Sequence, residues 1–409
     1  MTNTAILAAS GLLLFAYLLD IVGRRWKLPS VVLLIGTGIA LRKILDSTDL
    51  HLKWVDPIVP VIGTIGLILI VLEGALDLDV SKERLRLITM SATSAMLGFC
   101  ASLAGFIVLF QYMLGYDLPI AVLAAIPFAV ISSAVAIPAA NGLATQPREF
   151  VIYESSLSDI LGVLVFYAWL DANGSLQSFT FDLLGGGAVS LTAATVAALG
   201  LYYLINQLEG HVRFLPLIAG LICLYAVGKY LHLSPLILVL GCGLLINNPH
   251  LLRWNKQLRS FHSANYDQTL KEFKGLVAEL TFATKSFFFL LLGYWTDISQ
   301  LASRRAWLIG GAGIVIVYGS RWIILKLLRQ ESVAQLLWIA PRGLITVLLF
   351  LSATHSGSLY GFPLGAVMLF VLATATLTAF AHRQSPSVPD TAAVSEPAPM
   401  ADATAAPPS

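Results

Sequence analysis

The sequence predicts an all-α polytopic membrane protein with about thirteen transmembrane helices. Of its 409 residues, 57% are hydrophobic and only 12% are charged, and the mean hydropathy is +0.81. Soluble domains carry roughly 25% charged residues. The chain also contains many apolar runs near the 20 residues that a helix needs to cross a bilayer. These two observations exclude a soluble globular enzyme.

The predicted spans follow one another along residues 1–383, which we expect to form one transmembrane domain. The first apolar run lacks a basic start and a small-residue cleavage site, so we expect it to remain as a helix. From residue 384 to 409 the chain is rich in Pro, Ala and Ser and is predicted to be a disordered cytoplasmic tail. The spans are expected at 5–22, 28–45, 58–76, 87–112, 120–144, 151–171, 184–206, 213–230, 234–248, 277–295, 305–328, 333–352 and 360–381.

Basic residues alternate between connections and predict the orientation. The connections near 112–119, 171–183 and 353–359 contain no Lys or Arg. By the positive-inside rule the N-terminus lies outside and the C-terminus is cytoplasmic, in a cell (inner) membrane. The stretch 249–276 mixes basic and apolar residues and is interpreted as an amphipathic helix along the cytoplasmic interface; a plain loop is the alternative. The basic connections carry Arg24, Arg25, Lys27, Lys82, Arg84, Arg86, Arg253, Lys256, Arg259, Lys271 and Lys274.

Small counts limit the cofactors and partners. The three cysteines lie in separate apolar segments, and the seven histidines have no metal-ligand spacing. We therefore expect neither a disulfide framework nor a bound cofactor. A net charge of +2 gives no indication of a nucleic-acid partner, and none is expected.

Two carboxylates, Glu154 and Asp159, interrupt the apolar segment 151–171. A charged side chain at the centre of a bilayer costs about 3 kcal/mol on insertion scales, and such groups usually mark ion or proton pathways. Asp159 follows Ser155 by four residues, so both share one helix face, whereas Ser158 points about 100° away. Glu154 precedes Asp159 by five residues and lies on another face. We expect one acid to stay charged beside a fixed cation and the other to exchange ligands.

Three basic residues are candidate partners for the fixed acid: Arg321, Arg342 and Lys285. Arg321 lies well inside an apolar run, whereas Lys285 is nearer a helix end and can snorkel to the interface. A buried carboxylate paired with Arg is usually a structural brace, because removing one partner leaves an uncompensated charge. Glu154 and one Arg are therefore assigned to structure.

Two apolar segments carry signals of a broken helix. Segment 333–352 contains Pro341-Arg342-Gly343. Backbone groups freed at a break, together with Ser hydroxyls, can ligate a cation. A Pro-kinked packing helix remains the alternative for the other segment, residues 120–144. That segment, 120–144, contains Pro127, Ser132, Ser133, Pro138, Asn141 and Gly142.

Glu73 closes an apolar run and is followed by Gly74. Two interpretations stay open: a residue of the site, or an interfacial side chain that faces water. Asp77 and Asp79 beyond it are typical of a cytoplasmic boundary.

Five strings, in this order, resemble the monovalent cation–proton antiporters, the family of NhaP-type proteins and the membrane domain of sodium–proton exchangers. Each string alone is a weak signal, but together they extend over nearly the whole membrane region. They are Leu72-Glu73-Gly74-Ala75-Leu76-Asp77-Leu78-Asp79, Tyr153-Glu154-Ser155-Ser156-Leu157-Ser158-Asp159, Phe287-Phe288-Phe289-Leu290-Leu291-Leu292-Gly293, Gly319-Ser320-Arg321 and Ile339-Ala340-Pro341-Arg342-Gly343.

The resemblance implies an inverted-repeat fold, a homodimer, and a core crossed by two broken helices at 120–144 and 333–352. It implies that Asp159 binds the metal cation and the proton in turn, and that Glu154 pairs with Arg321. Arg342 is the charge at the crossing. Two departures concern the cation: Ser158 stands where the family has Asn or Asp, and Ile131-Ser132-Ser133-Ala134 replaces Thr-Asp-Pro. The further expected cation or proton ligands are Glu73, Ser155, Ser158, Ser132 and Ser133.

The predicted function is exchange of Na⁺, K⁺ or Li⁺ for H⁺ by competition at Asp159, which serves pH homeostasis. One exchangeable carboxylate predicts one cation per proton and no net charge moved. An intramembrane enzyme is disfavoured because a Gly-x-Gly-Asp signature is absent and the histidines at 51, 211, 232 and 355 fall at connections. A potassium efflux system or channel gated by a separate subunit remains the alternative.

Overall fold

The computed structural model describes residues 2–384, except 27–28, 48–58, 173, 182–184, 208–213, 232, 234, 253–265, 297, 331, 356–358 and 360–361. Within these ranges every regular element is helical. The predicted cytoplasmic tail at 385–409 lies outside the described residues. The described helices separate into two groups that pack mainly among themselves.

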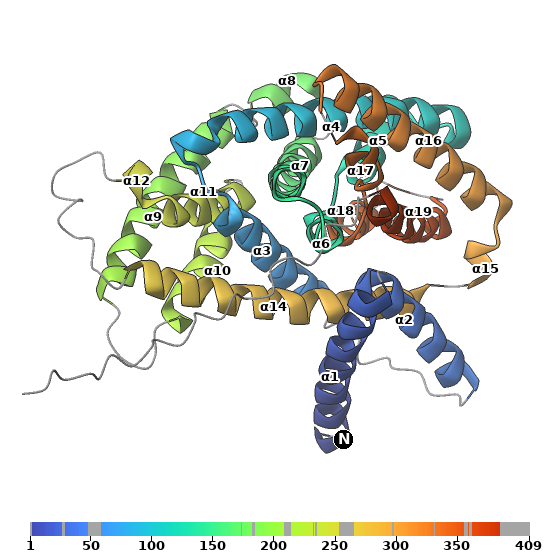
Figure 1. The fold of residues 1–409 in the computed structure, drawn as a ribbon, viewed down its shortest axis with the longest axis horizontal. Helices are drawn as coiled ribbons and strands as arrows, with labels where there is room; N and C mark the ends of the chain where they lie inside the picture. The colour runs from blue at the N-terminus through green and yellow to red at the C-terminus, as the bar shows by residue number, and fades with distance from the viewer. Residues whose placement is uncertain are drawn as a thin grey trace, which may run out of the picture.

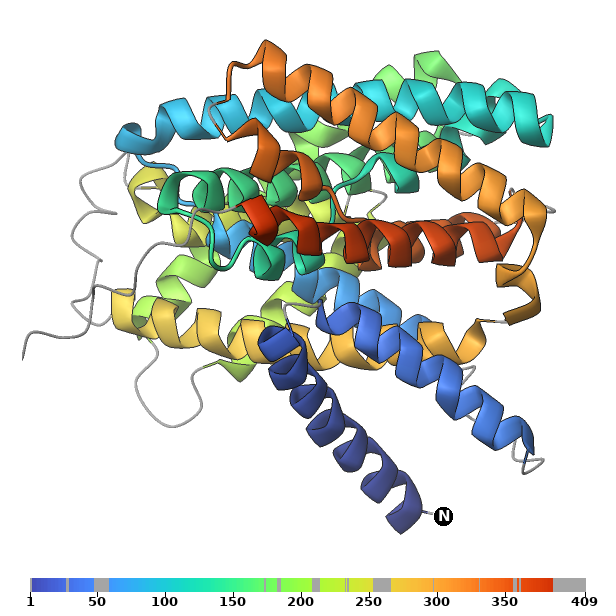
Figure 2. The same cartoon turned by 45° about the vertical axis from the view of Figure 1, so that its right-hand side comes forward.

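The first group, called the core group here, surrounds α7 and brings together two stretches far apart in sequence. In Figure 1 and Figure 2, α4 and α16 run along one side of the molecule, with α6, α7 and α18 beneath them. The group consists of α4 (Leu85–Leu114), α5 (Leu118–Ala129), α6 (Ser133–Ala139), α7 (Thr145–Asp171), α16 (Arg304–Leu327), α17 (Val333–Trp338), α18 (Leu344–His355) and α19 (Leu364–Leu377).

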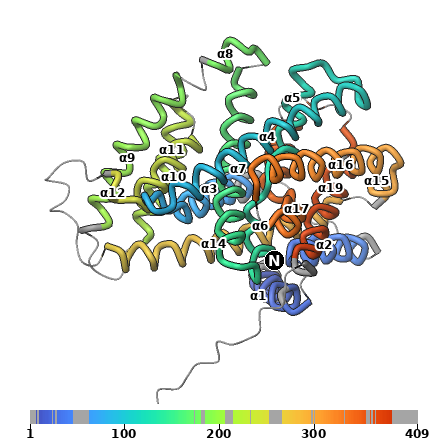
Figure 3. Tube along the Cα trace, turned by 45° about the horizontal axis from the view of Figure 1, so that its top comes forward, coloured from blue at the N-terminus to red at the C-terminus, as the bar shows by residue number. Residues whose placement is uncertain are grey.

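The second group, called the scaffold group, lies on the opposite side, where α14 is a long strut that contacts α1, α2, α3 and α9 (Figure 3). It faces the core group mainly through α3, α11 and α14, which contact α7 or α18. It consists of α1 (Thr2–Trp26), α2 (Ser30–Ser47), α3 (Val59–Asp77), α9 (Gly187–Gln207), α10 (Leu215–Tyr230), α11 (Pro235–Asn247) and α14 (Tyr266–Trp295). Short elements complete the chain: η1 (Lys82–Arg84), α8 (Leu176–Phe181), α12 (Pro249–Leu252), α15 (Ile298–Leu301) and η3 (Thr378–Gln384).

Apolar helices long enough to span a bilayer account for much of the described chain. Six helical stretches of the described chain meet this criterion by length and composition, one of them the stretch 118–139 that comprises α5 and α6, and five shorter apolar helices accompany them. The all-α membrane architecture predicted from the sequence is therefore confirmed. The number of crossings, about thirteen, stays a prediction.

Both segments predicted to be broken are interrupted. The first is split into α5 and α6 by extended backbone, with φ −78° and ψ 131° at Val130 and φ −80° and ψ 118° at Ser132. The second is split into α17 and α18 by residues 339–343. The two interruptions touch, because the backbone N–H of Ser132 donates to the carbonyl of Pro341 at 2.9 Å. Pro127 and Pro138 both lie within helices instead of at the first interruption.

The expected interfacial helix over 249–276 is not one continuous helix: 249–252 form the short helix α12, and 253–265 lie outside the described residues. Residues 266–276 continue into the predicted span 277–295 as the single helix α14. The side chain of Tyr266 is buried and donates to the carbonyl of Ile246 at 2.7 Å, and the ring of Phe273 lies 6.1 Å from that of Phe214. Tertiary contacts thus bury the apolar face that sequence alone suggested for the membrane surface.

The approach of α2 to α14 depends on two glycines. A Cβ at Gly38 would collide with the carbonyl oxygen of Leu290, and one at Gly293 would collide with that of Ile35. Small residues at such contacts let helix backbones approach closely in membrane proteins.

We expect Gly38→Ala to destabilise the protein by about 1–3 kcal/mol, the usual effect of overpacking. Gly36→Ala is the matched control, because a Cβ there meets nothing within 4 Å. The measurement is thermal unfolding of the purified protein in detergent. Equal melting temperatures for the two variants would show that the α2–α14 contact is looser than described.

Candidate functional site

Asp159 lies on α7 beside the first interruption, and its side chain is buried. Its Oδ2 atom accepts a hydrogen bond from the backbone N–H of Ser133 at 3.0 Å. Ser133 is the first residue of α6, so the positive end of that helix points at the carboxylate. Within the described ranges, the buried Oδ1 atom has no hydrogen-bond partner. One oxygen is therefore held in place and the other is open to a ligand.

Ser158, the neighbour of Asp159, serves the same interruption. Its Oγ accepts a hydrogen bond from the backbone N–H of Ile131 at 2.9 Å. Two consecutive side chains of α7 thus satisfy backbone donors that the break leaves without a helical partner. The structure gives Ser158 a backbone-capping contact, whereas the sequence suggested a cation ligand.

The remaining serines differ in how they are satisfied. The Oγ of Ser155 donates to the carbonyl of Val151 at 2.7 Å in its own helix, which leaves its lone pairs free to accept. The buried Oγ of Ser132 has no partner in the described part of the chain, and a Cβ at Gly343 would lie 2.6 Å from it. Ser132 therefore faces the second interruption closely, and only glycine fits opposite.

Sequence reasoning missed two buried hydroxyls close to these breaks. Ser156 on α7 and Thr346 on α18 have hydroxyl oxygens without a partner among the described residues. A lone Ser or Thr in an apolar run carries no signal of its own, because most such residues bond to their own helix.

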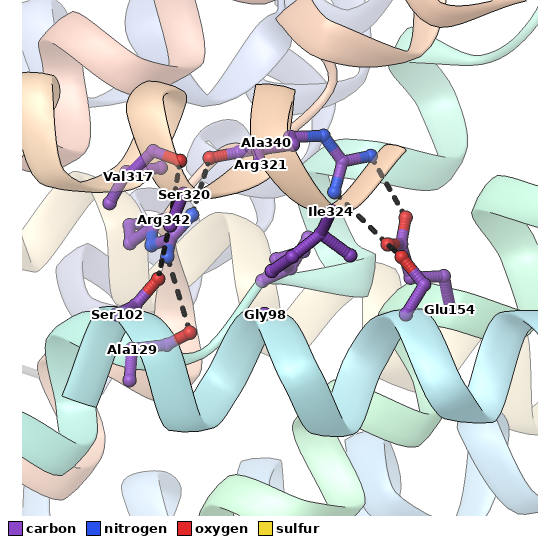
Figure 4. A pocket seen from close by; sticks show the side chains of 12 residues that line it. Gly98, Ser102, Ala129, Glu154, Val317, Ser320, Arg321, Ile324, Ala340 and Arg342 are labelled. Atoms are coloured by element: carbon purple, nitrogen blue, oxygen red, sulfur yellow. Dashed lines mark hydrogen bonds and ion pairs between the residues drawn. The ribbon is translucent and has the colours of Figure 1, made fainter. Parts of the chain in front are cut away.

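Glu154 is held by Arg321 in a buried, bidentate ion pair (Figure 4). The Nη1 and Nη2 atoms of Arg321 lie 3.1 and 2.8 Å from the two carboxylate oxygens. Ser94 on α4 donates to Oε1 at 2.6 Å, and the Nε of Arg321 donates to the carbonyl of Leu336 at 2.8 Å. The pair therefore ties together α4, α7, α16 and α17 next to the crossing.

Arg342 lies in the second interruption and is fully surrounded by protein, with 1% of its surface exposed. Its guanidinium donates to the carbonyls of Phe128, Ala129 and Ala340 at 2.9, 3.2 and 2.8 Å. Phe128 and Ala129 end α5, where a cation compensates the negative end of the helix. Arg342 and Asp159 thus balance the two helix ends that meet at the first interruption.

Lys285, a sequence candidate for pairing with Glu154, instead binds Glu73. Its Nζ atom lies 2.6 Å from Oε2 of Glu73, and the two side chains are 18% and 25% exposed. Glu73 lies on α3 and Lys285 on α14, both in the scaffold group. Glu73 is therefore part-buried and ion-paired, and its role in the site stays a prediction.

Clusters of His, Cys, Asp and Glu that could bind a metal are absent from the described residues. Over the part of the chain that the structure describes, no group of three or more His, Cys, Asp and Glu residues is placed to hold a metal ion.

Comparisons with known proteins agree on a family. The model of the sodium/hydrogen exchanger transmembrane family matches residues 10–382. A structure of the sodium proton antiporter MjNhaP1 from Methanocaldococcus jannaschii at pH 8 has a TM-score of 0.73 and 20% identity, over 93% of this chain and 98% of that one. An electron-microscopy structure of MjNhaP1 has a TM-score of 0.68 and 19% identity, over 94% and 98%. No curated protein sequence matches.

The predicted antiporter fold and family resemblance are thus confirmed. The match extends over nearly the whole described region, including both interruptions and Asp159. The chain belongs to the sodium/hydrogen exchanger family of membrane transporters.

Proposed function

We propose that the protein is a secondary active antiporter that exchanges a monovalent cation for H⁺ at Asp159. The observation that carries this proposal is the buried carboxylate itself: one oxygen is fixed by the N-terminus of α6 and the other is unpartnered at the crossing. Because the family and the structural neighbours are transporters, an intramembrane enzyme is set aside.

Competition for one carboxylate supplies the coupling. Removal of a carboxyl group from water favours its protonated form, whereas a nearby cation favours the ionised form. Cation and proton therefore exclude one another at Asp159. The hydroxyl oxygens of Ser132 and Ser155, with carbonyls freed at the breaks, are the proposed neutral ligands. When the site is exposed to each side of the membrane in turn, the gradient of one ion drives the other.

The substrate is proposed to be Na⁺ or K⁺, with Li⁺ as a possible third ion, exchanged one for one with H⁺. The relative MjNhaP1 is described as a sodium proton antiporter. The stretch Ile131-Ser132-Ser133-Ala134, which stands in place of the family's Thr-Asp-Pro, contains no acid and leaves fewer carboxylates near the cation. We further propose a homodimer in the cell membrane, with the N-terminus outside and the C-terminus cytoplasmic.

Asp159→Asn is expected to abolish cation-driven dissipation of a pH gradient in proteoliposomes, because the amide cannot release a proton. Na⁺, K⁺ and Li⁺ are compared side by side against choline. Asp267→Asn, at the exposed start of α14, is the matched control and should retain exchange. Residual coupled transport in Asp159→Asn would place the exchange site elsewhere.

Glu154→Gln is expected to lower stability by about 3–5 kcal/mol, because it leaves Arg321 buried without a partner. The folded fraction of the variant should show the same half-maximal cation concentration for exchange as the wild-type protein. The double replacement Glu154→Leu with Arg321→Met removes both charges and should recover much of the lost stability.

Thermal unfolding and exchange are measured on the same preparations of these variants. A Glu154→Gln protein with normal stability but altered cation dependence would make Glu154 a ligand instead of a brace.

Exchange by the wild-type protein is expected to be insensitive to membrane voltage. One net charge moved per cycle would change the driving force by about 2.3 kcal/mol per 100 mV. Proteoliposomes held at 0 and about 100 mV by a gradient of a permeant anion, because K⁺ is itself a proposed substrate, should give equal rates of Na⁺-driven proton flux. A voltage-dependent rate would contradict one-for-one exchange.

A further inference from the structure

The two intramembrane ion pairs differ in how firmly they are built. Arg321 and Glu154 share two hydrogen bonds, are 5% and 2% exposed, and have further polar partners on α4 and α17. Lys285 and Glu73 share one contact and are 18% and 25% exposed. The planar guanidinium of Arg321, fixed by two hydrogen bonds, suits a structural ion pair. A flexible lysine with one contact can leave its carboxylate at a smaller cost in interaction energy.

The loose pair faces the transport site. Gly74, next to Glu73 on α3, lies against α7, where a Cβ on Gly74 would be 4.0 Å from the Cβ of Ser156. The scaffold group therefore places a carboxylate on α3, which packs against the helix that carries Asp159, and the ammonium of Lys285 lies 2.6 Å from that carboxylate.

The ammonium of Lys285 has the character of a substrate. It is a compact, strongly hydrated point charge, as an alkali cation is, and it lies 2.6 Å from a carboxylate oxygen. A cation that binds Oε2 of Glu73 would have to take this position.

An alternative partner for the displaced lysine is within reach along the same helix. Asp77 follows Glu73 by four residues, so both acids share one face of α3. Asp77 interacts electrostatically with Lys285 and with Lys274 of α14. The ammonium of Lys285 can therefore move along α3 from Glu73 toward Asp77 and remain close to a carboxylate.

From this arrangement we infer that Lys285 is a tethered competitor of the transported cation, which binds Glu73 until the ion bridges Glu73 and Asp159. Lys285 thereby sets the cation concentration at which exchange is half-maximal. The inference rests on the proposed antiport at Asp159 and adds a specificity-determining residue to it.

The test measures half-saturating Na⁺ and K⁺ for exchange in proteoliposomes, together with cation-dependent thermal stabilisation in detergent at constant ionic strength. Lys285→Met should lower the half-saturating concentration by about fivefold and enlarge the thermal shift, because Glu73 becomes available. Lys285→Arg keeps the charge and should not show this gain. Lys326→Met is the control, since Lys326 lies over the ring of Trp322 on α16, at 4.2 Å from its centroid.

Glu73→Gln and the double variant Glu73→Gln with Lys285→Met separate competition from bracing. Glu73→Gln should raise the half-saturating concentration, because it removes a ligand and leaves an unpaired ammonium facing Asp159. The double variant has no unpaired charge in this pair and should bind cations more tightly than Glu73→Gln alone. A brace would give no such rescue, and the double variant stays informative if Lys285→Met fails to fold.

The outcomes distinguish the two proposals. If wild-type vesicles exchange no cation for protons, the proposed function fails. If wild type exchanges and Asp159→Asn does not, an unchanged or higher half-saturating concentration in Lys285→Met overturns the competitor role alone. A double variant no better than Glu73→Gln overturns it as well.

Discussion

The structure depends on satisfying backbone groups that two broken helices free inside an apolar region. Unpaired N–H and C=O groups cost several kcal/mol each where no water reaches them. Ser132 and Pro341 pair the breaks with each other, and side chains of α7 cap the N–H groups of Ile131 and Ser133. The candidate site is therefore part of what stabilises the fold, because Asp159 also satisfies a backbone N–H group that the break between α5 and α6 leaves without a helical partner.

Charge balance follows from the same requirement. The C-terminal carbonyls of α5 receive Arg342 and the N-terminus of α6 receives Asp159. Both helix ends are thus compensated, and Oδ1 of Asp159 is among the buried oxygens that have no hydrogen-bond partner in the described chain. The ion pair of Glu154 and Arg321 holds the surrounding helices together. The proposed exchange of ligands at Asp159 would therefore leave these helix contacts intact.

Local pattern was sufficient for much of this arrangement. Apolar run length gave the all-α membrane class, and the five-residue separation of Glu154 and Asp159 correctly placed them on different faces with different contacts. Long-range pairings were beyond it: Lys285 meets Glu73 across 212 positions of sequence, and Ser94 meets Glu154 across 60. The position of the first break was also hidden, because Pro127 and Pro138 fit within helices while capping by α7 fixes the interruption between them.

The charges around the crossing suggest why one-for-one exchange suits this chain. Asp159 and Glu73 bring two negative charges to the face between the groups, and Lys285 returns one positive charge. Under the proposed one-for-one exchange, one monovalent cation or one proton would neutralise the remaining single negative charge equally. An additional acid in the stretch Ile131-Ser132-Ser133-Ala134, where the family has Thr-Asp-Pro, would add a negative charge that one monovalent cation or one proton could not neutralise. The serines of this stretch and Lys285, which pairs with Glu73, therefore both contribute to the balance of charge at the proposed site.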